Sequence, residues 1–180
     1  TKGILHRLEA FDWFLTNHPE WREQVSLILL AVPSRTEVDM YIDLRNQIEG
    51  LIGRINGAYS TIDWTPIQYL YRSLPFEKLV ALYHAADVAL ITPLRDGMNL
   101  VAKEYVAAKA GADEPGMLIL SEMAGAASEL GEALIINPHH KARIVQAIVG
   151  ALEMPPEEQK RRNMQMQTRL ARYTVQRWAQ

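Results

Sequence analysis

Apolar segments that alternate with helical segments along the whole chain are the feature that most restricts its fold. Short runs rich in apolar residues predict buried strands at 25–32, 67–71, 87–91, 117–120 and 134–136. Apolar residues at helical spacing and helix-start signals predict helices at 4–15, 38–55, 76–85, 100–110, 124–130, 141–152 and 157–178, with Asn56-Gly57 stopping the second one. Right-handed crossovers between parallel strands then give a Rossmann-like α/β fold, a parallel sheet with helices on both faces.

The 180 residues are enough for one domain with a full core, so we predict a single domain over 1–180. Pro155-Pro156 interrupts the chain before its last segment, but one helix is too little for a second domain. Residues 156–180 are therefore predicted to be a C-terminal closing helix. Because the chain opens Thr1-Lys2-Gly3, without an initiator Met, we expect it to be a piece of a longer polypeptide.

Charge and composition exclude several classes of function. The net charge of −2 gives no reason to expect nucleic acid or an anionic membrane as a partner. The chain has no cysteine, which excludes disulfides, thiolate zinc sites and cysteine nucleophiles. No apolar run reaches the length of a membrane span and no signal peptide is visible, so we expect a cytoplasmic protein.

A charged turn with a glycine, residues 92–99, lies between the predicted strand 87–91 and the predicted helix 100–110. Open α/β sheets bind ligands at the carboxyl ends of their strands. A helix start also offers unpaired N–H groups and the positive end of the helix dipole, which suit phosphate. Core packing does not require so many polar side chains in one place, and this turn is therefore the candidate site.

Within the turn, Asp96-Gly97 can be interpreted in two ways. Asp-Gly pairs are common in plain turns. The position between strand and helix instead favours a ligand site, in which Asp96 accepts hydrogen bonds from sugar hydroxyls and Gly97 lets the backbone approach. The amides at the helix start would then be open to a diphosphate; they belong to Met98, Asn99, Leu100 and Val101.

Three charged residues outside the turn are further candidates. Glu104 lies about one turn into the helix, where it is either a solvated residue, an ion-pair partner of Lys103 or Lys109, or a carboxylate for the two hydroxyls of a ribose. Lys2 is either a disordered terminal lysine or a phosphate ligand at a loop-to-helix junction. Arg35 follows the strand 25–32 and is either exposed beside a helix cap or a contact to phosphate or an acceptor.

No Ser-His-Asp arrangement, P-loop or HExxH pattern is present in the sequence. The residues therefore indicate a site for an anionic ligand rich in hydroxyls, a nucleotide sugar. They do not support hydrolysis by a nucleophile of the chain.

The run from Arg95 to Tyr105, RDGMNLVAKEY, resembles the signature of the trehalose-6-phosphate synthases. Four further segments agree with that family in order and spacing: TKGI at 1–4, GRING at 53–57, WTP at 64–66 and SEMAGAA at 121–127. The resemblance implies the C-terminal, donor-binding domain of a retaining glycosyltransferase with the two-domain GT-B fold. The N-terminal acceptor domain of that fold has no counterpart in the sequence.

The activity implied by the resemblance is transfer of glucose from UDP-glucose to glucose 6-phosphate with retention, in trehalose biosynthesis, without a metal ion or other cofactor. Lys2 would hold the donor diphosphate, Asp96 the glucosyl hydroxyls and Glu104 the ribose. Backbone from Gly97 to Val101 would line the phosphates and the sugar, and Arg35 would reach the acceptor phosphate. No catalytic residue is certain in this half, because the family's catalytic His and the arginine that partners its lysine lie outside the sequence. We therefore expect the fragment alone to be inactive.

Two other functions stay open from the sequence. One is a glucosylglycerol-phosphate synthase, whose donor motifs look similar and whose acceptor is chosen mainly by the other half of the polypeptide. The other is a non-catalytic, synthase-like module that senses sugar phosphates. The presence of Lys2, Arg35, Asp96 and Glu104 argues against decay of the site and so against the second alternative.

Overall fold

The computed structural model describes residues 2–33 and 39–172, and the chain divides into two compact units. Unit 1 contains residues 1–7 and 76–180, and unit 2 contains residues 8–75. Both units have parallel strands with helices packed against them, which confirms the predicted α/β class. The strands are hydrogen-bonded as two sheets, whereas the sequence predicted one. Alternation of strands and helices gives strand direction, but it does not determine which strand edges pair.

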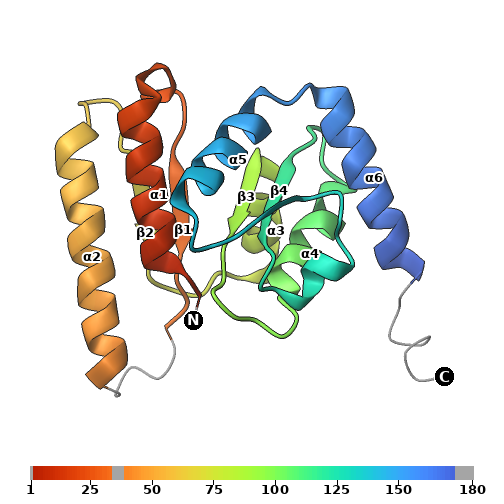
Figure 1. The fold of residues 1–180 in the computed structure, drawn as a ribbon, viewed down its shortest axis with the longest axis horizontal. Helices are drawn as coiled ribbons and strands as arrows, with labels where there is room; N and C mark the ends of the chain where they lie inside the picture. Colours follow the sequence, from red (N-terminus) through yellow and green to blue (C-terminus); the bar gives the residue numbers. More distant parts are fainter. Residues whose placement is uncertain (1, 34–38, 173–180) are drawn as a thin grey trace. The chain divides into compact units, whose positions relative to one another are not determined.

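Unit 2 is built on two parallel strands, which Figure 1 labels β1 and β2. In their register Leu27 lies opposite Ile67 and Leu30 opposite Leu70. Its elements are α1 (Ile4–Asn17, which begins in unit 1), η1 (Pro19–Trp21), β1 (Leu27–Leu30), α2 (Asp39–Tyr59) and β2 (Ile67–Leu70). Leu15 and Ile55 are fully buried in its core, as the helical spacing of their segments predicts.

The predicted end of α2 at Asn56-Gly57 is wrong, because the helix continues to Tyr59. The Asn56 side chain does not form a turn. Its Nδ2 donates to the Ile67 carbonyl at 2.9 Å, and its Oδ1 accepts from the Ile67 N–H at 2.9 Å. The asparagine therefore ties the last helical turn to the start of β2, a long-range role that the local Asn-Gly pattern does not reveal.

Unit 1 has a three-stranded parallel sheet in the order β3-β4-β5, of which Figure 1 labels β3 and β4. Its strands are β3 (Val88–Ile91), β4 (Met117–Ser121) and β5 (Leu134–Ile136). Its helices are α3 (Phe76–Ala85), α4 (Leu100–Lys109), the short 3-10 helix η2 (Gly125–Ser128), α5 (Lys141–Glu153) and α6 (Pro156–Arg172). The central strand β4 is buried along its whole length.

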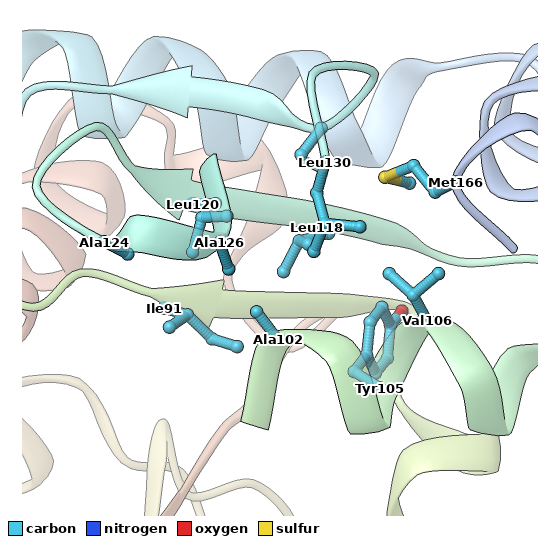
Figure 2. Close-up of a cluster of buried hydrophobic side chains, with 11 residues drawn as sticks. Ile91, Ala102, Tyr105, Val106, Leu118, Leu120, Ala124, Ala126, Leu130 and Met166 are labelled. Atoms are coloured by element: carbon cyan, nitrogen blue, oxygen red, sulfur yellow. The ribbon is translucent and has the colours of Figure 1, made fainter. Parts of the chain in front are cut away.

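Helices cover both faces of β4. Leu118 and Leu120 belong to one hydrophobic cluster with Tyr105 and Val106 of α4, and Met166 of α6 closes the cluster (Figure 2). Residues of a strand alternate between its two faces, so Ile119 points to the opposite face, which α5 contacts. Burial on both faces explains why β4 appears in the sequence as a continuous apolar run.

The helix α6 packs against α4 and is tied to unit 1 by polar contacts. Arg169 makes a two-pronged ion pair with Glu132, with N–O distances of 2.7 and 2.6 Å. The buried Asn163 donates its Nδ2 to the Gly116 carbonyl at 2.6 Å. Across the described part of the chain, none of the helices combines the length and apolar character needed to cross a membrane.

Candidate functional site

The turn between β3 and α4 gathers its polar groups around the carboxylate of Asp96. Oδ2 of Asp96 accepts from Nζ of Lys2 at 3.3 Å and from Nδ2 of Asn99 at 3.2 Å. Oδ1 accepts from the Met98 amide at 3.2 Å. The structure thus brings Lys2, from the start of the chain, to the turn that the sequence singled out.

Burial alone would raise the pKa of the Asp96 carboxyl. The hydrogen bond from the Met98 amide, the hydrogen bond and charge of Lys2 and the hydrogen bond from Asn99 outweigh it, so the pKa lies below its ordinary value. Asp96 is consequently a carboxylate at neutral pH. It can accept hydrogen bonds from hydroxyl groups, and it is also the counterion of an ammonium group.

Asn99 forms the N-cap of α4, as its position in the sequence predicts. Its backbone has a φ of 74°, and its Oδ1 accepts from the Ala102 amide at 3.0 Å. The side chain is buried, so it supports the helix start and leaves contacts with a ligand to the backbone. Asparagine tolerates this left-handed conformation better than most residues.

Three of the four amides predicted to be open at this helix start have no hydrogen-bond acceptor among the described residues: those of Asn99, Leu100 and Val101. The fourth prediction is wrong, because the Met98 amide binds the Asp96 carboxylate. The apolar side chains of Met98, Leu100 and Val101 are 51%, 60% and 48% exposed, and Gly97 is exposed as well. The helix start is therefore open to solvent and offers N–H groups and a positive dipole end to an anion.

The loop after β4 holds the turn in place through its backbone. Gly125 N–H donates to the Asp96 carbonyl at 3.0 Å, and Ala126 N–H donates to the Met98 carbonyl at 2.7 Å. A Cβ on Gly125 would lie only 2.8 Å from the carbonyl carbon of Gly97. Gly125 therefore packs on the site turn, whereas Ala126 is buried in the hydrophobic cluster of unit 1 and Ala127 packs against that cluster.

A second glycine brings Lys2 to the site. Gly3 has a φ of 67°, and a side chain there would collide with the Thr92 carbonyl at the end of β3. Arg7 strengthens this contact: its Nε donates to Oγ1 of Thr92 at 3.1 Å and its Nη2 to the Lys2 carbonyl at 3.4 Å. Burial lowers the pKa of Arg7 to about 10. Arg7 was not among the predicted site residues, because its only sequence signal is a charge on a helix that is otherwise apolar at this spacing.

Glu104 is exposed on α4, one helical turn beyond Leu100. Its Oε2 accepts a hydrogen bond from the hydroxyl of Tyr83 on α3 at 2.9 Å. Among the described residues, Glu104 makes no hydrogen bond or ion pair with Lys2 or Asp96. Arg35 lies outside the described residues.

The chemistry of these groups suits an anion that also carries hydroxyls. The ammonium group and the open amides can bind phosphate, and the two carboxylates can accept from hydroxyl groups. Across residues 2–33 and 39–172, no cluster of three or more His, Asp and Glu side chains has the arrangement of a metal site.

Comparisons with known proteins agree on one family over the whole chain. The model of Glycosyltransferase family 20 matches residues 1–180. A bifunctional trehalose-6-phosphate synthase/phosphatase of Thermoproteus tenax is 54% identical over 178 residues, which are 99% of this chain. A glucosylglycerol-phosphate synthase of Pseudomonas anguilliseptica is 47% identical over 178 residues, again 99% of the chain.

Among solved structures, a UDP-forming α,α-trehalose-phosphate synthase of Burkholderia xenovorans in complex with glucose 6-phosphate matches with a TM-score of 0.95. It is 43% identical in sequence over 99% of this chain. The chain spans only part of these proteins: 24% of the length of each of the two curated relatives and 39% of the crystallised chain.

Proposed function

The chain belongs to glycosyltransferase family 20, and we propose that it forms the donor-binding part of a UDP-forming α,α-trehalose-phosphate synthase. In this proposal the complete polypeptide transfers glucose from UDP-glucose to glucose 6-phosphate with retention. The single observation that carries the proposal is the contact between Lys2 and Asp96 beside the open start of α4. In this proposal, Lys2 and the N–H groups of the helix start bind the diphosphate, and the neighbouring Asp96 carboxylate binds the hexose.

Each group has a role in the proposed reaction. The acceptor hydroxyl attacks the glucosyl carbon from the side on which UDP leaves, so no nucleophile of the chain is required. Lys2 and the helix-start amides stabilise the negative charge that develops on the leaving diphosphate. Asp96 and the backbone at Gly97 hold the hexose, while Glu104 holds the ribose, and positioning lowers the barrier further.

We also propose that transfer needs no metal ion, because Lys2 and the amides supply the positive charge that phosphate requires. If so, a complete synthase containing this chain keeps its activity after treatment with a chelator. Loss of activity that returns on adding Mg²⁺ would overturn this part of the proposal.

Two kinds of relative bear on the identity of the acceptor. The relative with 54% identity and the crystal structure with bound glucose 6-phosphate favour glucose 6-phosphate, with Arg35 proposed as the contact to its phosphate. The glucosylglycerol-phosphate synthase with 47% identity supports a different acceptor on the same donor site. Steady-state assays of the complete polypeptide with each acceptor distinguish the two, and Arg35→Ala should raise the KM for the acceptor more than that for the donor.

Calorimetry with UDP and UDP-glucose tests the donor site directly. We expect the 180-residue chain to bind both ligands weakly, at millimolar nucleotide. Lys2→Met should weaken binding about tenfold, which corresponds to 1.4 kcal/mol. Lys103→Met is the matched control, since Lys103 lies on α4 but pairs with Glu129. A folded chain that releases no heat with either ligand would contradict the proposal.

A further inference from the structure

The carboxylate assigned to the ribose has one hydrogen-bond partner within the described residues. This partner is the hydroxyl of Tyr83, 2.9 Å from Oε2 of Glu104. The two residues lie 21 positions apart, on α3 and α4. Oε1 of Glu104 accepts no hydrogen bond from the described residues, and Glu104 is exposed.

Tyr83 is held in position by the core on which it packs. Its ring lies edge-on to the ring of the fully buried Tyr105, with centroids 6.2 Å apart and planes at 79°. It also packs against the hydrophobic cluster of unit 1 in Figure 2. The hydroxyl of Tyr83 therefore reaches Glu104 from a fixed direction, in contrast to a donor on a flexible surface chain.

The Tyr83 hydroxyl stays protonated and can always donate its hydrogen bond to Glu104. Burial raises the pKa of its phenol, and the hydrogen bond to Glu104 and the negative charge of Glu104 raise it further. The hydroxyl thus keeps its proton throughout the physiological range. A carboxylate that accepts from it cannot rotate freely, and it loses less side-chain entropy when a ligand binds.

We propose that Tyr83 is a positioning residue that orients Glu104 toward the two ribose hydroxyls and so sets the preference for ribonucleotides. The inference rests on the proposed donor site. Tyr83 does not touch the nucleotide itself. Its contribution is therefore seen only in ligands that carry the hydroxyl groups that Glu104 binds.

The test compares Tyr83→Phe with Tyr105→Phe in the 180-residue chain. Both substitutions remove one hydroxyl from the same aromatic pair, but the Tyr105 hydroxyl donates to the Ala86 carbonyl at 3.0 Å and not to Glu104. Calorimetry gives the Kd for UDP, 2′-deoxy-UDP and pyrophosphate. We expect Tyr83→Phe to weaken UDP about fivefold, 2′-deoxy-UDP less and pyrophosphate less than twofold. Tyr105→Phe should leave the ratios between the three ligands unchanged.

A double substitution tests the route through Glu104. Tyr83→Phe should add no loss of UDP affinity in a Glu104→Ala background, because the group it orients is gone. Glu104→Asp shortens the carboxylate side chain without altering the aromatic pair, so it tests the inference even if Tyr83→Phe does not fold. We expect it to lower the preference for UDP over 2′-deoxy-UDP.

The outcomes separate this inference from the proposed function. Equal losses for UDP and pyrophosphate in Tyr83→Phe, or additive losses in the double variant, would each overturn the role of Tyr83 and leave the donor site intact. An unchanged preference in Glu104→Asp would remove Glu104 from the ribose and overturn the role of Tyr83 with it, while the proposed contacts to the phosphates and the hexose would stand. A folded wild-type chain that binds neither UDP nor UDP-glucose would overturn the proposed function, and the role of Tyr83 with it.

Discussion

Asp96 is a carboxylate whose three hydrogen-bond donors come from its own turn and from the distant Lys2. The donors from the turn, Met98 and Asn99, fix the orientation of the carboxylate, and Lys2 balances its charge. A substitution at Asp96 that keeps the shape of the side chain but removes its charge should therefore preserve the turn and alter only the binding of ligands.

We predict that Asp96→Asn weakens UDP-glucose more than UDP. Asparagine can still accept from the Met98 amide, so the turn should persist, but the glucosyl hydroxyls lose a charged acceptor. We expect about a tenfold loss for UDP-glucose and less than threefold for UDP, measured by calorimetry. Asp113→Asn, at an exposed turn of the same unit, is the control. Equal losses for both ligands would count against a contact between Asp96 and the hexose.

Arg7 is the second residue whose role can be tested by substitution, because it joins the Lys2 backbone to the end of β3. We expect Arg7→Met to weaken pyrophosphate and UDP by a similar factor, about fivefold, since Lys2 loses its position relative to the phosphates. Arg143→Met on α5 is a control that removes a charge from an exposed site. Unchanged pyrophosphate affinity in Arg7→Met would refute this role.

At the scale of elements, the site turn and the η2 loop form one backbone assembly. Gly125 is required where its amide meets the Asp96 carbonyl and its Cα faces Gly97. A neighbouring glycine in the same segment, Gly131, has no atom within 4 Å of where a Cβ would stand. The two positions thus provide a matched pair.

We predict that Gly125→Ala lowers the free energy of unfolding by about 1–3 kcal/mol, because the added methyl group displaces the 96–98 backbone. Gly131→Ala should be neutral, or stabilising by up to about 1 kcal/mol, since it restricts the unfolded chain. Urea unfolding followed by circular dichroism measures both. A neutral Gly125→Ala would mean that the turn shifts freely.

The ion pair between α6 and the loop before β5 makes stability depend on pH. The hydrogen bond from Arg169 lowers the pKa of Glu132, and it outweighs the effect of burial. A lowered pKa in the folded state contributes stability above the unfolded value of 4.5, and this contribution is lost as the pH falls through the folded pKa.

Glu132→Gln should therefore destabilise the protein by about 1 kcal/mol at pH 7, and the difference from wild type should shrink as the pH falls below 4.5. Urea unfolding at several pH values checks this. Glu153→Gln, at an exposed position at the end of α5, should show no such dependence. A difference that is constant with pH would show that the ion pair does not carry it.

At the scale of the whole molecule, the chain divides into two compact units, and β4 is the central strand of the sheet in the larger unit. Leu118→Ala should lower the free energy of unfolding by about 2–5 kcal/mol, because the cluster of α4, α6 and β4 cannot close around the lost volume. Ile135→Ala on β5, whose side chain is 40% exposed, should cost less than about 1.5 kcal/mol. A small effect of Leu118→Ala in urea unfolding would contradict the central role of β4.

Local features of the fold and site could be predicted from the sequence. The strands of unit 1, the helix cap at Asn99 and the position of Asp96 depend on residues that are neighbours in the chain. Tyr83 and Gly125 could not be assigned, because their roles come from contacts between elements far apart in the sequence. The end of α2 was predicted wrongly for the same reason, because Asn56 forms its hydrogen bond with Ile67 on another element. The pairing of the strands into two sheets also depends on contacts between separate elements.

The contact between Lys2 and Asp96 means that, before any ligand arrives, the site contains its own internal counterion. A diphosphate that draws the ammonium toward itself would free one oxygen of the Asp96 carboxylate for a sugar hydroxyl. Recognition of the hexose would then be conditional on the phosphates, and a free monosaccharide would have to compete with the lysine. Such an exchange selects activated sugars over the far more abundant free ones through a single pair of side chains.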